Sequence, residues 1–248
     1  MSFYINSTEL KEAYFNGSEV SSIYYNGTLV WDSWEWPGWS AATWQDIYKL
    51  CKQKQAGSIT AWPSDVVLGA TKTVTLSTAV LGTSSTTMRI IGLDHDGSGT
   101  ITFQTVNTLS TSTAWCSSTA SASNAKWSTS IARIRCNTFY TYCEAKPYIK
   151  QVSKKTYYCE SSTTSTLQTE NIYCFLLSQS ELTGSGLSEG SQYDYFTSTT
   201  TMKKNQTYWL RTTTDGSYTQ AQRVTTSGVV SGLAKTTVSY LAPCFVIG

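Results

Sequence analysis

Residues 86–106 read TTMRIIGLDHDGSGTITFQTV, and this stretch decides the class of fold. Asp94, Asp96 and Ser98 stand at alternate positions, as the oxygen ligands of a calcium-binding helix–loop–helix do. That motif needs a bidentate carboxylate at its twelfth position, which here is Thr105. The flanking residues are of strand type, and Asp and Gly supply the backbone of a turn between them. We therefore expect a β-hairpin and no calcium sensor, with a weak structural calcium site at the three oxygen-bearing residues as the alternative.

The composition of the whole chain indicates a β-rich globular protein. Its 248 residues suffice for one large domain with a small appendage. Aromatic residues make up 13% of the chain, and together with Thr they suit pleated, half-buried strands. Charged residues make up only 14% and the net charge is +2, so we expect no capture of nucleic acid. We also expect no membrane insertion and no signal peptide, because no suitable apolar run is visible.

The first thirty residues contain a ten-residue repeat. Its three units are FYINSTEL (3–10), AYFNGSEV (13–20) and IYYNGTLV (23–30). Each unit places an Asn-Gly or Asn-Ser pair between aromatic or β-branched residues, which is typical of a tight hairpin. We expect residues 1–33 to form an N-terminal β-repeat used for attachment or oligomerisation. The Trp-rich junction that follows, residues 34–40, is either a packing hub within the fold or a subunit interface.

The body of the chain, residues 41–248, has an α+β pattern. Residues 43–55 have helical spacing, with Thr43 or Ser40 as the cap and Gly57 as the stop. A second helix is expected within residues 124–143, with Trp127, Ile131, Ile134 and Thr138 on one face. Short strands are expected within 66–82, 86–106, 171–178, 207–212, 221–230 and 239–248.

Sequence patterns of catalysis are weak. Residues 186–190 read GLSEG, which matches a nucleophile elbow, but the one His of the chain, His95, lies upstream. A chance match in a loop is the better interpretation, and nothing in the sequence brings Glu181 and Glu189 together for glycoside chemistry. The seven cysteines include no Cys-x-x-Cys pair, which favours buried thiols over disulfides or zinc. We therefore expect no enzyme and, apart from the calcium alternative, no cofactor.

The repeat has a family resemblance. Residues 14–31, YFNGSEVSSIYYNGTLVW, resemble segments at the front of tail and fibre proteins of bacteriophages that infect Gram-positive bacteria. An ordinary β-meander is the alternative interpretation. The resemblance implies a protein of the virion tail, assembled in the host cytoplasm, that contacts other virion proteins and forms a homotrimer.

The body resembles an uncharacterised domain family of Gram-positive gut bacteria and their phages. The resemblance rests on six sequence motifs that occur in the same order: RIIGLDHD (89–96), WSTSIARIR (127–135), FLLSQSEL (175–182), EGSQYDYF (189–196), YWLR (208–211) and Pro243-x-Phe245. That family is similar to the C-type lectin-like fold of formylglycine-generating enzymes and phage variable proteins. The resemblance implies two helices, twisted antiparallel strands and long loops. It also implies that Trp209 packs in the core and Arg211 forms an internal ion pair. Two residues depart from the pattern: Ala242 replaces an Arg, and Thr212 replaces a Ser.

These resemblances predict a receptor-binding protein. We expect a phage tail adhesin that recognises a bacterial surface glycan or protein through polar and aromatic loop residues. The expected contact residues are Tyr193, Asp194, Tyr195, Thr213, Asp215, Ser217, Tyr218 and Tyr240. The alternatives are a virion decoration or assembly protein without a receptor, a bacterial surface binding protein and a glycan-modifying enzyme.

Overall fold

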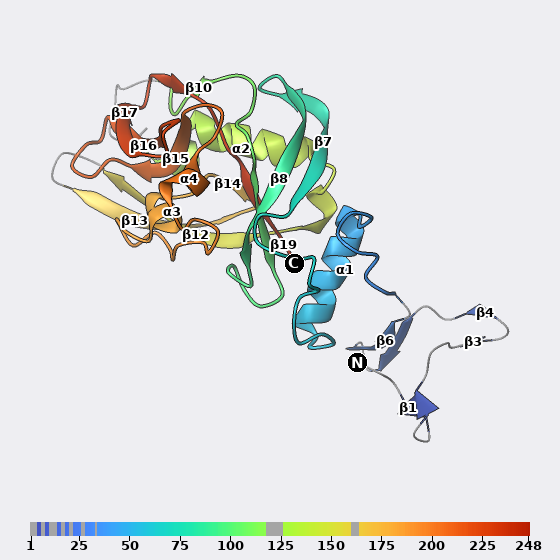
Figure 1. The fold of residues 1–248 in the computed structure, drawn as a ribbon. Helices are drawn as coiled ribbons and strands as arrows, with labels where there is room; N and C mark the ends of the chain where they lie inside the picture. The colour runs from blue at the N-terminus through green and yellow to red at the C-terminus, as the bar shows by residue number, and fades with distance from the viewer. Residues whose placement is uncertain are drawn as a thin grey trace. The chain divides into compact units, whose positions relative to one another are not determined.

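The computed structural model describes residues 34–117, 126–159 and 164–248 with their side chains, and the backbone of six short strands before them. The chain divides into two compact units, Met1–Val66 and Val67–Gly248. Figure 1 shows the elements of both units, which are described separately here. No helix in the described part of the chain is both long enough and apolar enough to cross a membrane.

The repeat forms three antiparallel hairpins, as predicted. Strand β1 (Tyr4–Ile5) pairs with β2 (Thr8–Glu9), and β3 (Tyr14–Phe15) pairs with β4 (Ser18–Glu19). Strand β5 (Ser22–Tyr25) pairs with the longer β6 (Thr28–Asp32). The turn pairs at residues 6–7, 16–17 and 26–27 lie outside the described residues, so the expected turn conformation is not tested.

The predicted helix at 43–55 is confirmed as α1 (Trp44–Gln55). Thr43 is its cap: the Thr43 hydroxyl accepts from the Asp46 N–H at 3.2 Å, and the Asp46 carboxylate accepts from the Thr43 N–H at 2.8 Å. This reciprocal arrangement satisfies two backbone donors that the first helical turn leaves without partners. The helix was predicted as part of the body, but it belongs to the first compact unit.

The Trp-rich junction makes contacts inside the first unit. The Trp34 indole donates to Asp46 at 3.1 Å, and the Trp36 indole donates to Asp65 at 3.0 Å. The two rings meet edge to face with centroids 6.2 Å apart. These contacts give the indole N–H groups internal partners, as a packing hub requires.

The second unit is built on an antiparallel sheet with strand order β11-β19-β9-β8-β7. Strands β7 (Thr71–Val80) and β8 (Thr83–Leu93) form its long hairpin, and β9 (Ile101–Thr105) follows. Strand β19 (Cys244–Ile247) lies between β9 and β11 (Ile149–Lys150), and the short β14 (Cys174–Phe175) also pairs with β19. Helices and mainly antiparallel strands together confirm the α+β class.

The second predicted helix is present, but its buried face was predicted wrongly. A short 3₁₀ turn, η2 (Trp127–Thr129), comes first, and Ser130 then caps α2 (Ile131–Tyr142). The helix buries Ala132, Cys136 and Phe139 against β7 and β14, whereas Ile134 is 54% exposed. The prediction counted helical positions from Trp127, but Trp127 lies in the 3₁₀ turn before the helix. Because α2 begins only after the Ser130 cap, a different set of residues faces the core.

The remaining elements complete the unit beside this sheet. Strands β12 (Val152–Cys159) and β13 (Ser165–Ile172) form a long hairpin that was not predicted. Strands β15 (Tyr208–Thr213), β16 (Gln220–Val224) and β17 (Val230–Ala234) form a three-stranded sheet. Helix α3 (Gln179–Thr183) and strand β12 both contact β15. The smaller elements are β10 (Thr113–Ala114), η3 (Lys146–Tyr148), α4 (Thr199–Met202) and β18 (Val238–Ser239).

Candidate functional site

The opening stretch forms the predicted hairpin. Residues 94–100 connect β8 to β9, and the Asp94 carboxylate accepts from the Gly99 N–H at 2.6 Å inside this turn. The Asp96 carboxylate points into the unit, where it accepts from the Thr102 hydroxyl at 2.5 Å. Among the described residues, no three His, Cys, Asp or Glu side chains are grouped so that they could hold a metal ion. The calcium alternative at Asp94, Asp96 and Ser98 therefore gains no further ligand.

Asp96 belongs to a buried charge cluster, which we define as Asp96, Lys154, Glu181, Tyr193 and Arg211. The Lys154 ammonium donates to Asp96 at 2.5 Å, to Glu181 at 2.9 Å and to the Tyr193 hydroxyl at 2.7 Å. Arg211 donates to the other Glu181 oxygen at 2.6 Å, and the Tyr193 hydroxyl donates to Asp96 at 2.8 Å. Every charged side chain in the cluster is at most 8% exposed. Two cations and two carboxylates thus neutralise one another inside the unit.

Glu181 connects this cluster to helix α3. Its carboxylate accepts from the Ser178 N–H at 3.1 Å, and the Ser178 hydroxyl accepts from the Glu181 N–H at 3.1 Å, so the pair caps the helix. Burial raises the pKa of Glu181, but the charges of Arg211 and Lys154 outweigh burial and lower that pKa to about 2. The ion pair expected for Arg211 is confirmed. The core position expected for Trp209 is also confirmed, because its side chain is fully buried.

A second carboxylate, Glu189, lies beside the cluster with different partners. It accepts from the Tyr157 N–H at 2.8 Å and from the Thr212 hydroxyl at 2.5 Å. Burial raises the pKa of Glu189, although the charge of Arg211 opposes this shift. Arg211 donates to the Glu181 carboxylate at 2.6 Å and to the Glu189 backbone carbonyl at 3.5 Å, so the fold brings both residues to Arg211, which no sequence pattern predicted.

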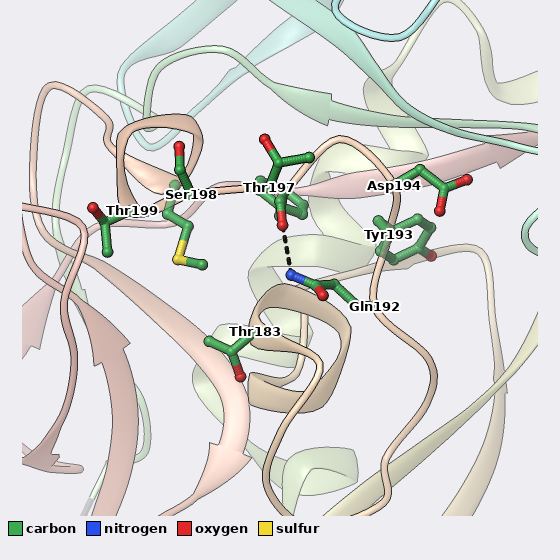
Figure 2. A pocket seen from close by; sticks show the side chains of 9 residues that line it. Thr183, Gln192, Tyr193, Asp194, Thr197, Ser198 and Thr199 are labelled. Carbon is green, nitrogen blue, oxygen red and sulfur yellow. Dashed lines mark hydrogen bonds between the residues drawn. The ribbon is translucent and has the colours of Figure 1, made fainter.

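A pocket with a volume of about 470 Å³ lies between α3, the loop 192–198 and α4, and we call it the Asp194 pocket. Figure 2 shows its lining side chains, which come from the end of α3, the loop 192–198 and helix α4. Tyr193, Phe196 and Met202 also belong to the lining, although each of them is buried. Most of the lining is polar: Thr183, Gln192, Asp194, Thr197, Ser198 and Thr199.

Gln192 holds the loop of the Asp194 pocket in place. Its amide nitrogen donates to the Leu182 carbonyl at 3.1 Å and to the Phe196 carbonyl at 2.5 Å, and the second bond is drawn in Figure 2. Gly184, which ends α3 with φ +71°, allows this approach, since a Cβ there would lie 2.7 Å from the Gln192 oxygen. The loop is therefore fixed to the helix end before any ligand binds.

A smaller pocket of about 220 Å³ lies on the other side of the same loop, and we call it the Ser191 pocket. His95 forms part of it and stacks on the Tyr193 ring with centroids 3.8 Å apart. Burial lowers the pKa of His95, so the ring is neutral at pH 7, and its Nε2 lies 3.4 Å from the Ser191 hydroxyl. The rest of the lining comes from the β8–β9 turn, strand β12, helix α3 and the loop after α3: Asp96, Ser153, Lys154, Lys155, Glu181, Ser188, Glu189 and Gly190.

The GLSEG sequence lies in the loop that borders the Ser191 pocket. Ser188 has a positive φ of 58°, but a nucleophile elbow joins a strand to a helix, and residues 186–190 follow α3 as irregular loop. The expected structural context is therefore missing.

The structure separates the predicted contact residues into buried and exposed positions. Tyr193 and Thr213 are buried, which corrects the expectation that their side chains contact a ligand. Tyr193 belongs to the charge cluster, and the Thr213 hydroxyl donates to the Tyr157 carbonyl at 3.2 Å. Asp194, Asp215 and Tyr218 are exposed, whereas Tyr195, Ser217 and Tyr240 are half-buried.

The two predicted loops contact different parts of the unit. The Tyr195 N–H donates to the Ile91 carbonyl at 3.3 Å, beside the central sheet. Asp215 instead accepts from the Tyr157 hydroxyl at 2.7 Å, on the β12–β13 hairpin. Of the predicted residues, Asp194 lines the Asp194 pocket with an exposed side chain.

Sequence reasoning missed Lys154 and Gln192. Strand β12 buries Val152, Lys154, Thr156 and Tyr158 at every second position. This alternation places Lys154 on the inner face and is visible in the sequence VSKKTYYC, so a strand prediction there would have found it. No comparable signal marks Gln192, because its role depends on the end of α3.

The family comparison concerns the second unit. No curated protein and no solved structure matches the chain. Residues 104–247, more than half of the chain, match the model of the DUF6273 family, described as a domain of unknown function, and the chain therefore belongs to this family.

Proposed function

We propose that this protein is a receptor-binding protein of a phage tail, and that its second unit is a ligand-binding domain of the C-type lectin-like kind. The observation that carries the proposal is the Asp194 pocket, where hydroxyl, amide and carboxylate groups surround a space of about 470 Å³. Such groups give directional hydrogen bonds to a polar ligand. A surface glycan of the host bacterium is the ligand that this chemistry fits best.

Binding rather than catalysis is supported by how the carboxylates are used. Asp96 and Glu181 neutralise Lys154 and Arg211, and Glu189 accepts two internal hydrogen bonds. In contrast, the exposed Asp194 lies on a loop that Gln192 fixes in position. A rigid loop loses little entropy when a ligand binds, which favours recognition.

The hairpin repeat would attach this domain to the particle. Short two-stranded hairpins are marginally stable alone in water, so they gain most by packing on other chains. In the proposal they pack as a homotrimer and against other virion proteins, after assembly in the host cytoplasm. Size-exclusion chromatography with light scattering measures this directly, and a monomer would contradict the trimer.

Cell binding tests the function. Fluorescently labelled full-length protein is incubated with a panel of Gram-positive gut bacteria, and binding to at least one strain is expected. Asp194→Ala should abolish that binding, whereas Asp215→Ala, an exposed Asp on the other predicted loop, should retain it. If Asp215→Ala abolishes cell binding and Asp194→Ala does not, the binding site is not the Asp194 pocket. Equal adsorption of phage particles with and without the protein would instead favour the decoration or assembly role.

A further inference from the structure

The Asp194 pocket and the Ser191 pocket adjoin each other across one short piece of chain. Gly190 and Ser191 line the smaller pocket, and Gln192, Tyr193 and Asp194 line the larger one. These lining residues are consecutive in the chain, so the two pockets border the same short segment of the loop. Tyr193 belongs to the lining of the larger pocket, and its buried ring stacks on His95 of the smaller one, so one residue supports both pockets.

Both pockets offer similar chemistry to a ligand. Ser153, Ser188 and Ser191 bring hydroxyl groups to the smaller pocket, as the Thr and Ser residues do in the larger one. In the smaller pocket, Asp96, Lys154 and Glu181 are neutralised by ion pairs with one another and with Arg211, and the exposed Lys155 disfavours a cationic ligand. Asp194 brings a negative charge to the larger pocket, which disfavours an anionic ligand. A neutral, hydroxyl-rich ligand fits both pockets.

The spacing between the pockets is fixed by the fold. Gln192 binds the loop to α3, the Tyr193 hydroxyl is held by Asp96 and Lys154, and the Tyr193 N–H donates to the Glu181 carbonyl at 2.9 Å. Two sites at a fixed, short separation bind a linked ligand more tightly than its separate units, because the second contact becomes intramolecular.

We propose that the two pockets are adjoining subsites for one linear, neutral oligosaccharide chain, which crosses the loop at Ser191-Gln192 with at least one sugar unit on each side. This inference rests on the proposed function and adds the ligand class and its minimum length. It predicts that the protein recognises a polymer of the bacterial surface and responds poorly to free monosaccharides.

The test is a chain-length series measured with the full-length protein. Neutral hexose and N-acetylhexosamine oligomers of one to about six units are immobilised on an array, and the best series is titrated by calorimetry. The affinity of the disaccharide or a longer oligomer should exceed that of its monosaccharide by about tenfold or more. Equal affinity for monosaccharide and oligomer would overturn the two-subsite arrangement.

Blocking variants test each subsite separately. Ser191→Tyr fills the smaller pocket and Thr197→Tyr fills the larger one, and both positions are exposed, so the fold should tolerate the new ring. Each variant should reduce oligomer affinity about tenfold or more and remove the dependence on chain length. Thr226→Tyr, on the exposed turn between β16 and β17, is the matched control and should bind like the wild type.

The outcomes separate this inference from the proposed function. Protein that binds bacterial cells but shows no preference for oligomers, or loses affinity in only one blocking variant, overturns the two-subsite inference alone. Protein that binds neither cells nor any neutral oligomer overturns both.

Discussion

Two regions of the second unit use the same kinds of polar side chain for opposite purposes. In the buried charge cluster, Tyr193 is fully buried and its hydroxyl joins Asp96 to Lys154. In the Asp194 pocket, the very next residue of the chain is exposed and lines a cavity. One short segment thus forms internal bonds on its inner side, and its outer side lines the pocket that we propose binds the ligand. Substitutions on the inner side should therefore lower the free energy of unfolding, and substitutions on the outer side should reduce cell binding.

The largest effect is expected from Arg211→Met. This change leaves Glu181 with one cation instead of two and removes the donor to the Leu176 carbonyl. Breaking a buried ion pair from one side costs about 3–5 kcal/mol, so unfolding by denaturant should show a loss of that size. Arg133→Met is the control, because Arg133 lies 3.8 Å from a partly exposed Glu170 and should lose less than about 1 kcal/mol. Similar losses in the two variants would contradict the comparison.

Acid should weaken the cluster through Glu181. Its pKa is about 2 in the folded protein against 4.5 ordinarily, so its stabilisation is complete above about pH 4.5 and is lost as the pH falls toward 2. At about 1.4 kcal/mol for each pKa unit, acidification from about pH 6 to about pH 3 should remove on the order of 2 kcal/mol of this contribution. Denaturation curves at both pH values should show a smaller acid loss in Glu181→Gln than in the wild type.

Glu189 should have the opposite effect on how the free energy of unfolding changes with acid. Burial raises its pKa, so the folded protein binds this proton more readily than the unfolded chain does, and Glu189 makes the wild type more resistant to acid. Glu189→Gln should therefore show a steeper acid loss. If stability falls with pH in the same way in both Gln variants, Glu181 and Glu189 do not have the opposite effects on acid stability that their pKa shifts predict.

A smaller effect is expected from Tyr193→Phe. The ring and its packing remain, but Lys154 and Asp96 each lose a hydrogen-bond partner inside the unit. Leaving buried polar groups without a partner costs about 1–3 kcal/mol, which thermal and denaturant unfolding can measure. Tyr218→Phe, at a side chain that is 41% exposed, should be nearly neutral. If the two variants are equally stable, the Tyr193 hydroxyl has no structural role.

Local spacing explains what the sequence could predict. The hairpin at 86–106, the helix at 43–55 and the Thr43 cap depend on residues within a few positions of one another, and all three are confirmed. The ion pair of Arg211 was predicted from the YWLR motif of the family resemblance, although its partner Glu181 was not named. Hydrophobic spacing was less reliable at α2, where Ala132 and Cys136 carry the buried face and Ile134 lies outside.

The parts that were missed depend on contacts between distant segments. The Tyr193 ring can lie inward because Gly92 leaves it room: a Cβ at Gly92 would lie 2.7 Å from the ring. Nothing near Tyr193 in the sequence reveals that glycine, which comes from strand β8. Lys154 was missed because no strand was predicted at Val152–Cys159, where strand alternation turns one of two adjacent lysines inward.

The smallest stability effect is expected at Asp194, and it gives the sharpest contrast with the cluster. Asp194→Asn keeps the size of an exposed side chain, so the free energy of unfolding should change by no more than about 0.5 kcal/mol. Asp96→Asn makes the same chemical change inside the cluster, where it removes a charge that faces Lys154, and should lose several times more. Cell binding should show the reverse order when both proteins are assayed at a temperature where both are folded. A stability loss at Asp194 as large as that at Asp96 would mean that the outer side of the loop also serves the fold.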